Sequence, residues 1–178
     1  MLFSQTPALA GTVSAAWNGS SCTQYGSGIA VGLLEAHAFR CNNVTGATGN
    51  AILTKTNSGD DGARFDCAGV KISGLTSNTD DGTFANSSGT SANWSSTSTT
   101  TTNANDAVVA FFSGETDTGT TVGTWQSSFT RLVRVGDSAG GCCVLDYGYR
   151  VVSGTGAYTG AVNGNVSSNY LGYVAAFK

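Results

Sequence analysis

Two acidic residues that follow the most apolar run of the chain are the first candidates for catalysis. Glu115 and Asp117 lie in the sequence Gly-Glu-Thr-Asp-Thr-Gly-Thr of residues 114–120. This order begins like a Glu-x-Asp-x-x-Glu arrangement for glycoside hydrolysis, in which two carboxyl groups act on one glycosidic bond. The second catalytic carboxyl group would stand at position 120, where the chain has Thr120. The sequence therefore predicts that the protein is not a glycosidase.

The single histidine is the next candidate. His37 lies in Leu-Glu-Ala-His-Ala-Phe of residues 34–39, where Glu35 and His37 would share one face of a strand. No Gly-x-Ser-x-Gly sequence offers a nucleophile for a Ser-His-acid triad. We therefore expect His37 to be a structural residue bonded to Glu35 or to a nearby carbonyl group. No catalytic residue is assigned, and the chain is predicted not to be an enzyme.

The cysteines could form disulfide bonds or links between subunits; they are Cys22, Cys41, Cys67, Cys142 and Cys143. Because their number is odd, at least one cysteine must remain a free thiol or form a disulfide bond with another chain. Each could equally be a small buried apolar residue. The side chains of Cys142 and Cys143 would point to opposite faces of a strand, so these two cysteines are expected to bond with two different partners.

Metal and cofactor sites are not expected. None of the cysteines has Cys-x-x-Cys spacing, and a single histidine makes a zinc site a poor fit. Two Asp-Asp-Gly sequences, at 60–62 and 80–82, do not space their carboxylates at alternate residues as a calcium loop does. Ordinary turn chemistry explains them better.

Three aromatic residues are candidates for contact with a glycan: Trp94, Trp17 and Tyr25. Carbohydrate binding needs an exposed aromatic platform, and Trp94 lies in a stretch of Ser, Thr, Asn and Gly. That setting makes Trp94 the strongest candidate. Trp17 and Trp125 lie closer to apolar residues, and the core is the better interpretation for both.

Composition bounds the fold and the partners. The 178 residues include 25 Gly and one Pro, and only 11% of them are charged. Because helix formers such as Lys, Glu and Gln are scarce, an all-β fold is favoured. A net charge of −3 argues against nucleic acid. The sequence contains no run of 18 apolar residues, so no membrane helix is predicted. Residues 1–10 lack the basic start of a signal peptide, so a cytoplasmic or already mature product is expected.

Short apolar runs between turn residues predict buried strands. The central one is Asp106–Ser113, with similar runs at 28–39 and 170–178. Residues 12–17 are a further strand, residues 1–11 are expected to be an N-terminal arm, and residues 86–105 a low-complexity polar loop or a polar edge strand. Residues 143–152 alternate with the period of a half-buried strand. Strands at intervals of about 8–12 residues predict one domain over 1–178, a single antiparallel β-sandwich that is jelly-roll-like.

Several segments in the C-terminal half resemble a β-sandwich module that recurs in tailed-phage structural proteins and large bacterial extracellular proteins. They are Ala-Asn-Asp-Ala-Val-Val-Ala-Phe-Phe (104–112), Phe-Thr-Arg-Leu (129–132), Tyr-Gly-Tyr-Arg-Val-Val (147–152), Gly-Ala-Tyr-Thr (156–159) and Tyr-Val-Ala-Ala-Phe-Lys (173–178). The resemblance covers about residues 104–178 and lacks the usual Pro-rich opening. It implies a structural module and brings no catalytic residue with it.

Two functions are therefore expected. The first is a non-enzymatic structural protein of a virion, a tailed-phage capsid decoration or appendage component, whose partners are other virion proteins and copies of itself. The second is a carbohydrate-binding or adhesive module on a phage or bacterial surface, whose partner is a glycan. The expected location is the virion for the first, and secreted or on the cell surface for the second.

Overall fold

A computed structural model describes residues 2–7, 11–32, 34–42, 44, 49–57, 66–76, 80–115, 123–136 and 144–178. Every regular element among these residues is a β-strand, and every strand pairing is antiparallel. The all-β, antiparallel β-sandwich predicted from the sequence is confirmed. In this part of the chain there is no helix that could span a membrane.

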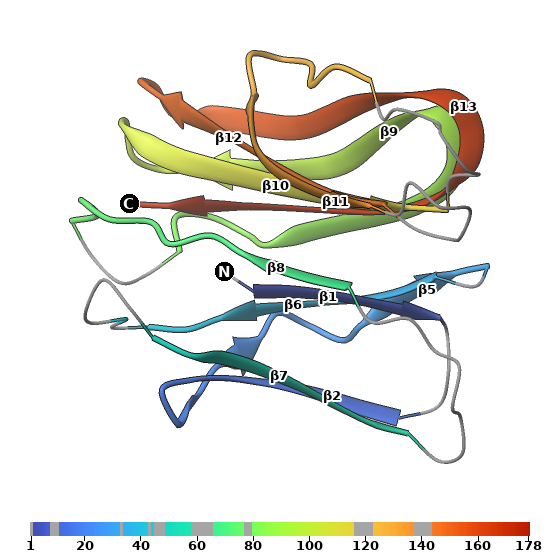
Figure 1. Cartoon of the computed structure of the whole chain (residues 1–178). Helices are drawn as coiled ribbons and strands as arrows, with labels where there is room; N and C mark the ends of the chain where they lie inside the picture. The colour runs from blue at the N-terminus through green and yellow to red at the C-terminus, as the bar shows by residue number, and fades with distance from the viewer. Residues whose placement is uncertain are drawn as a thin grey trace.

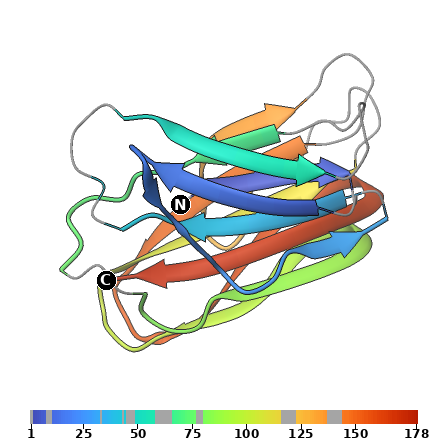
Figure 2. The same ribbon diagram turned by 90° about the horizontal axis from the view of Figure 1, so that it is seen from below.

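The strands form three stacked layers (Figure 1). The C-terminal sheet has the order β11 (Thr130–Gly136), β12 (Val144–Val152), β10 (Asp106–Gly114), β13 (Gly156–Phe177), β9 (Ala85–Thr101). The middle sheet has the order β4 (Thr23–Gln24), β6 (Leu34–Arg40), β1 (Leu2–Pro7), β8 (Asp66–Gly69), and β5 (Ile29–Val31) also pairs with β6. The small sheet has the order β3 (Ser20–Ser21), β2 (Gly11–Trp17), β7 (Ala51–Asn57). Seen from below, β2 and β7 lie in front of the other layers (Figure 2).

β10 is central, as its apolar run predicts. It pairs with β12 on one side and with β13 on the other. Val109 and Phe111 on β10 are at most 1% exposed and face the middle sheet, where Leu34 and Ala36 of β6 are fully buried. The hydroxyl group of Tyr173 on β13 donates across the layers to the carbonyl of Ala36, at 2.9 Å. The main core therefore lies between the C-terminal and middle sheets.

Two predicted boundaries are wrong. Residues 28–39 are not one strand, because the chain turns at Gly32 and β5 pairs back on β6. Gly32 has φ of +57°, a conformation that glycine adopts without strain. The expected N-terminal arm contains β1, which lies between β6 and β8 in the middle sheet. The pairing partners of β1 come from distant parts of the chain, so the local sequence does not predict this strand.

The C-terminal sheet curls over on itself (Figure 1). β9 and β13 are 17 and 22 residues long, and their pairing shifts register between Asn163 and Ser168, where both strands bend. The first half of β13 then covers the outer face of β10, and Gly160 lies so close to Ala110 that a Cβ atom there would be 2.5 Å from the alanine methyl group. Trp125 bridges to Val162 of β13, so residues 123–126 close the curl. A second core fills the inside of the curl.

The Ser/Thr-rich residues 86–105 mostly belong to β9, the last strand of the C-terminal sheet, so the edge-strand alternative describes them. Because β9 is bent, side-chain hydroxyl groups in its second half reach carbonyl groups in its first half and just before it. Thr99 donates to the carbonyl of Thr83 at 2.6 Å, and Thr97 donates to that of Asn86 at 2.8 Å. Hydroxyl groups thus bond carbonyls along an edge that could otherwise pair with another chain.

Replacing Thr99 by Val should lower the free energy of unfolding by about 1–2 kcal/mol, because a fully buried hydroxyl group would be lost and the Thr83 carbonyl would lose this donor. Thr100→Val is the matched control, since Thr100 is exposed on the same strand and should change stability by less than about 0.5 kcal/mol. Urea titration of both variants measures the difference. Equal midpoints would show that the Thr99 bond does not stabilise the edge.

Candidate functional site

An apolar hollow of about 700 Å³ lies between β7 of the small sheet and β8 of the middle sheet. Its walls are residues 51–53 of β7, residues 67–69 of β8, and Trp17, Cys41, Val44, Val70 and Lys71. Apart from the amine of Lys71, these side chains are apolar, aromatic or sulfur-containing. The hollow therefore suits apolar groups better than the many hydroxyl groups of a sugar.

Trp17 is the one predicted glycan contact that lies at this hollow. Its ring packs against the backbone at Gly49, where a Cβ atom would come within the van der Waals radius of the indole. The indole Nε1 atom is buried and has no hydrogen-bond partner. A sugar platform needs an open ring face with polar groups beside it. At Trp17 the backbone of Gly49 covers part of the ring, and the walls of the hollow are mainly apolar.

Trp94 is placed differently from the prediction. It is fully buried in the second core, where it stacks on Tyr170 with ring centroids 6.1 Å apart. Its indole N–H donates to the carbonyl of Ser91 at 3.0 Å. Gly114 makes room for the indole, because a side chain there would collide with it. The polar residues beside Trp94 in the sequence lie on the outer face of the bent β9. Trp94 is therefore a core residue and not a glycan platform.

Tyr25, the third aromatic candidate, is held by neighbours. Its ring stacks on Phe84 with centroids 4.3 Å apart, and the guanidinium of Arg40 lies 5.9 Å from its centroid. Its hydroxyl group donates to Asp80 Oδ1 at 2.6 Å, and Arg40 pairs with the same atom at 2.6 Å. Burial and the bond to Asp80 raise the pKa of Tyr25 well above its usual value. Tyr25 thus ties β4 to the segment before β9.

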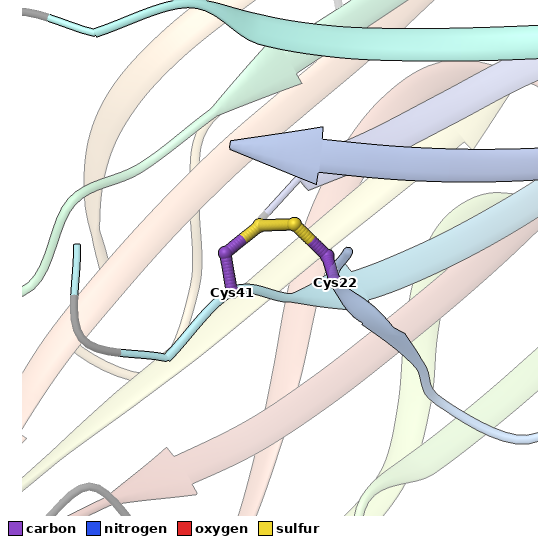
Figure 3. The surroundings of a disulfide bond; sticks show 2 residues. All are labelled: Cys22 and Cys41. Atoms are coloured by element: carbon purple, nitrogen blue, oxygen red, sulfur yellow. A yellow bond between two sulfur atoms is a disulfide. The ribbon is translucent and has the colours of Figure 1, made fainter. Parts of the chain in front are cut away.

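A disulfide bond joins Cys22 and Cys41, two of the five candidate cysteines (Figure 3). Cys22 lies where the chain leaves β3 of the small sheet and enters β4 of the middle sheet, and Cys41 directly follows β6. The bond packs against Val13 and Phe39. It therefore fastens the small sheet to the middle sheet. Cys67 is exposed on β8 at the hollow, and Cys142 and Cys143 lie outside the described residues.

Replacing both Cys22 and Cys41 by Ala should lower the free energy of unfolding by about 3 kcal/mol, because the bond closes a chain segment of 19 residues in the unfolded state. Urea titration measures the loss. The natural protein titrated with reductant is the control and should fall to a similar midpoint. An unchanged midpoint in the double variant would show that the small sheet holds without the bond.

The acidic and histidine candidates do not assemble into a catalytic group in the described residues. His37 Nε2 lies 2.8 Å from Glu35 Oε1, which confirms the predicted structural pairing, and Gln24 contacts the other ring nitrogen at 3.2 Å. Glu115 accepts a hydrogen bond from Asn169 at 2.7 Å. Asp117 and Thr120 lie outside the described residues. The described residues contain no group of three or more His, Cys, Asp or Glu side chains that could hold a metal ion.

An ion pair between a buried aspartate and a partly exposed arginine, which the sequence did not reveal, holds the curl together. Asp146 on β12 is fully buried, and it accepts hydrogen bonds from Arg131 Nε at 3.0 Å and from Trp125 Nε1 at 2.9 Å. Arg131 also donates to the carbonyl of Gly123 at 2.6 Å. The alternating pattern of residues 143–152 predicts one polar face, but the curl covers that face at Asp146. We refer to Asp146, Arg131 and Trp125 as the Asp146 clamp.

A second buried acidic group lies where β10 begins. Asp81 and Asp106 are each 1% exposed, and their carboxyl groups lie close enough to shift each other's pKa. Asp81 also accepts bonds from the backbone N–H groups and side chains of Thr102 and Asn103, at 2.5–2.8 Å. The amine of Lys178 lies 3.5 Å from Asp81 Oδ1. We refer to these two aspartates as the Asp81–Asp106 pair.

The two carboxyl groups of the pair differ in their affinity for a proton. Burial disfavours the charge of Asp81, but the hydrogen bonds from Asp106, Thr102 and Asn103 outweigh it and hold the pKa of Asp81 well below its usual range. Burial, the hydrogen bond to Asp81 and the negative charge of Asp81 raise the pKa of Asp106 to about 6, although Lys178 opposes this rise. The pair thus carries one proton below about pH 6, and that proton is on Asp106.

Comparisons of the chain with protein-family models, with curated proteins and with solved structures found no match.

Proposed function

We propose that this protein is a non-enzymatic structural protein of a virion, a decoration or appendage component of a tailed-phage capsid. The observation that carries the proposal is how the fold uses its buried polar groups. The Asp146 clamp, the Asp81–Asp106 pair and the Thr99 hydroxyl group each link segments that are distant in sequence. These links and the disulfide bond suit a protein whose task is to keep its shape.

The resemblance to a phage structural module supports the same proposal. The segments that carry it lie mainly in β10, β11, β12 and β13, which are adjacent in the C-terminal sheet. The partners proposed are other virion proteins and further copies of this chain.

Quantitative mass spectrometry of particles purified from the source tests the proposal. The protein should co-purify with intact particles and show a constant copy number relative to the major capsid protein. Antibodies raised against the recombinant protein should label the particles in electron micrographs. Recovery of the protein only outside particles would contradict the proposal.

A glycan-binding module is the second candidate function, and Trp17 is the predicted glycan contact whose ring borders the hollow. A glycan array distinguishes the two functions. The virion proposal expects no saturable binding. Binding that is lost in Trp17→Ala and kept in Thr100→Val, an exposed change elsewhere, would favour the carbohydrate module.

A further inference from the structure

A lysine and two buried carboxyl groups meet at one end of the C-terminal sheet. Lys178 follows β13, Asp81 lies before β9, and Asp106 begins β10. Lys178 Nζ lies 3.5 Å from Asp81 Oδ1, and the positive charge of Lys178 also acts on Asp106. An amine held at this distance from a buried carboxyl group has the proximity that accelerates amide formation.

Asp106 is placed to donate a proton to Asp81. Neither of its carboxyl oxygens accepts a hydrogen bond from another group, although the side chain is 1% exposed. A buried carboxylate without donors is unfavourable, and together with the charge of Asp81 this raises the pKa of Asp106 to about 6. Below about pH 6 Asp106 is therefore a neutral acid beside the Asp81 carboxylate. The charged and titratable groups that face Asp106 among the described residues are Asp81 and Lys178.

The donors around Asp81 resemble an oxyanion hole. Backbone N–H groups of Thr102 and Asn103 both point to Oδ2, at 2.5 and 2.8 Å. The Thr102 hydroxyl group and the Asn103 side-chain amide point to Oδ1. Fixed donors of this kind stabilise the negative oxygen of a tetrahedral intermediate.

We propose that Lys178 and Asp81 form an intramolecular isopeptide bond and that Asp106 is the catalytic acid. The reactive state is the minor one in which a proton has passed from the Lys178 ammonium group to Asp81, against the donors that favour the carboxylate. In that state the neutral amine attacks Cγ of Asp81. Asp106 donates its proton to the departing hydroxyl group and recovers one from the attacking nitrogen. The Nζ–Cγ bond forms, one Cγ–O bond breaks, and one water molecule leaves, so no oxidant or other reactant is needed.

The bond would join the end of β13 to the segment before β9, across 97 positions of sequence. It would close the C-terminal sheet covalently at the end opposite the bend of β9 and β13. This inference does not depend on the proposed virion function, because the chemistry requires only this chain.

Intact-mass spectrometry of the denatured protein tests the proposal. The natural sequence, incubated at pH 5–6, should weigh less than its calculated mass by one water molecule. Lys178→Arg should keep the full mass, and Lys71→Arg, which changes an exposed lysine elsewhere, should lose water as the natural sequence does. Asp106→Asn should keep the full mass or lose water far more slowly, because its amide can still donate to Asp81 but has no acid proton to give.

Fragment spectra separate this bond from a known side reaction. Asp81 precedes Gly82, and an Asp-Gly sequence can lose water by closing a backbone succinimide. The proposal expects a branched fragment that links residue 178 to the peptide containing Asp81. It is overturned if the natural sequence keeps its full mass, if Lys178→Arg still loses water, or if the loss maps to the backbone at residues 81–82. The Lys178→Arg comparison remains decisive if Asp106→Asn does not fold, because the Lys178 side chain is 34% exposed.

The pH dependence gives an independent readout of Asp106. Its pKa is raised to about 6, so the acid form is lost as the pH rises through that value. The initial rate of water loss at pH 8 should therefore be at least tenfold lower than at pH 5. A rate that does not fall between these pH values would exclude Asp106 as the acid.

Discussion

Replacing Arg131 by Met is expected to lower the free energy of unfolding by about 3–5 kcal/mol, because the buried carboxylate of Asp146 would lose its charged partner. Asp146 is fully buried, and without Arg131 its carboxylate would keep only the indole N–H of Trp125 among the bonds of the clamp. The lower figure is the better estimate, since the Arg131 side chain is 38% exposed. Residues 123–126 would also lose a link to β12.

Urea titration followed by tryptophan fluorescence measures this loss. The double variant Arg131→Met with Asp146→Asn is the control, because a neutral amide costs less to bury than a charge. It should be more stable than Arg131→Met alone. A single variant within about 1 kcal/mol of the natural protein would mean that Asp146 is reached by water and that the clamp is not structural.

Replacing Val109 by Asp is expected to abolish folding. Val109 is 1% exposed at the centre of β10 and faces the core between the C-terminal and middle sheets. An unpaired carboxylate there costs several kcal/mol, against a total stability of about 5–15 kcal/mol for a typical domain. The protein should appear in the insoluble fraction after expression.

The matched control is Val151→Asp. Val151 lies on the neighbouring strand β12 and is 66% exposed, so the same change places the carboxylate in water. This variant should remain soluble and unfold cooperatively. A soluble and cooperatively folded Val109→Asp protein would show that β10 is not the centre of the core.

The sequence alone predicted the features that depend on neighbours along the chain. The apolar run of β10 between turn residues identified a strand buried on both faces, and the spacing of Glu35 and His37 identified their pairing. The scarcity of helix formers identified an all-β protein. Local periodicity reports on which face of a strand a side chain lies, so these features follow from a few consecutive residues.

The tertiary structure decided what covers each face, because the covering strands come from distant parts of the chain. Trp94 lies among polar residues in sequence, yet the bend of β9 and β13 places it beside Tyr170 in a core. The same bend buries Asp146 on a face that alternation predicts to be polar. Asp81 and Lys178 are 97 positions apart, and only the ends of β13 and β9 bring them together. Pairings of this kind depend on backbone hydrogen bonds and layer packing between remote segments, and no short stretch of sequence encodes them.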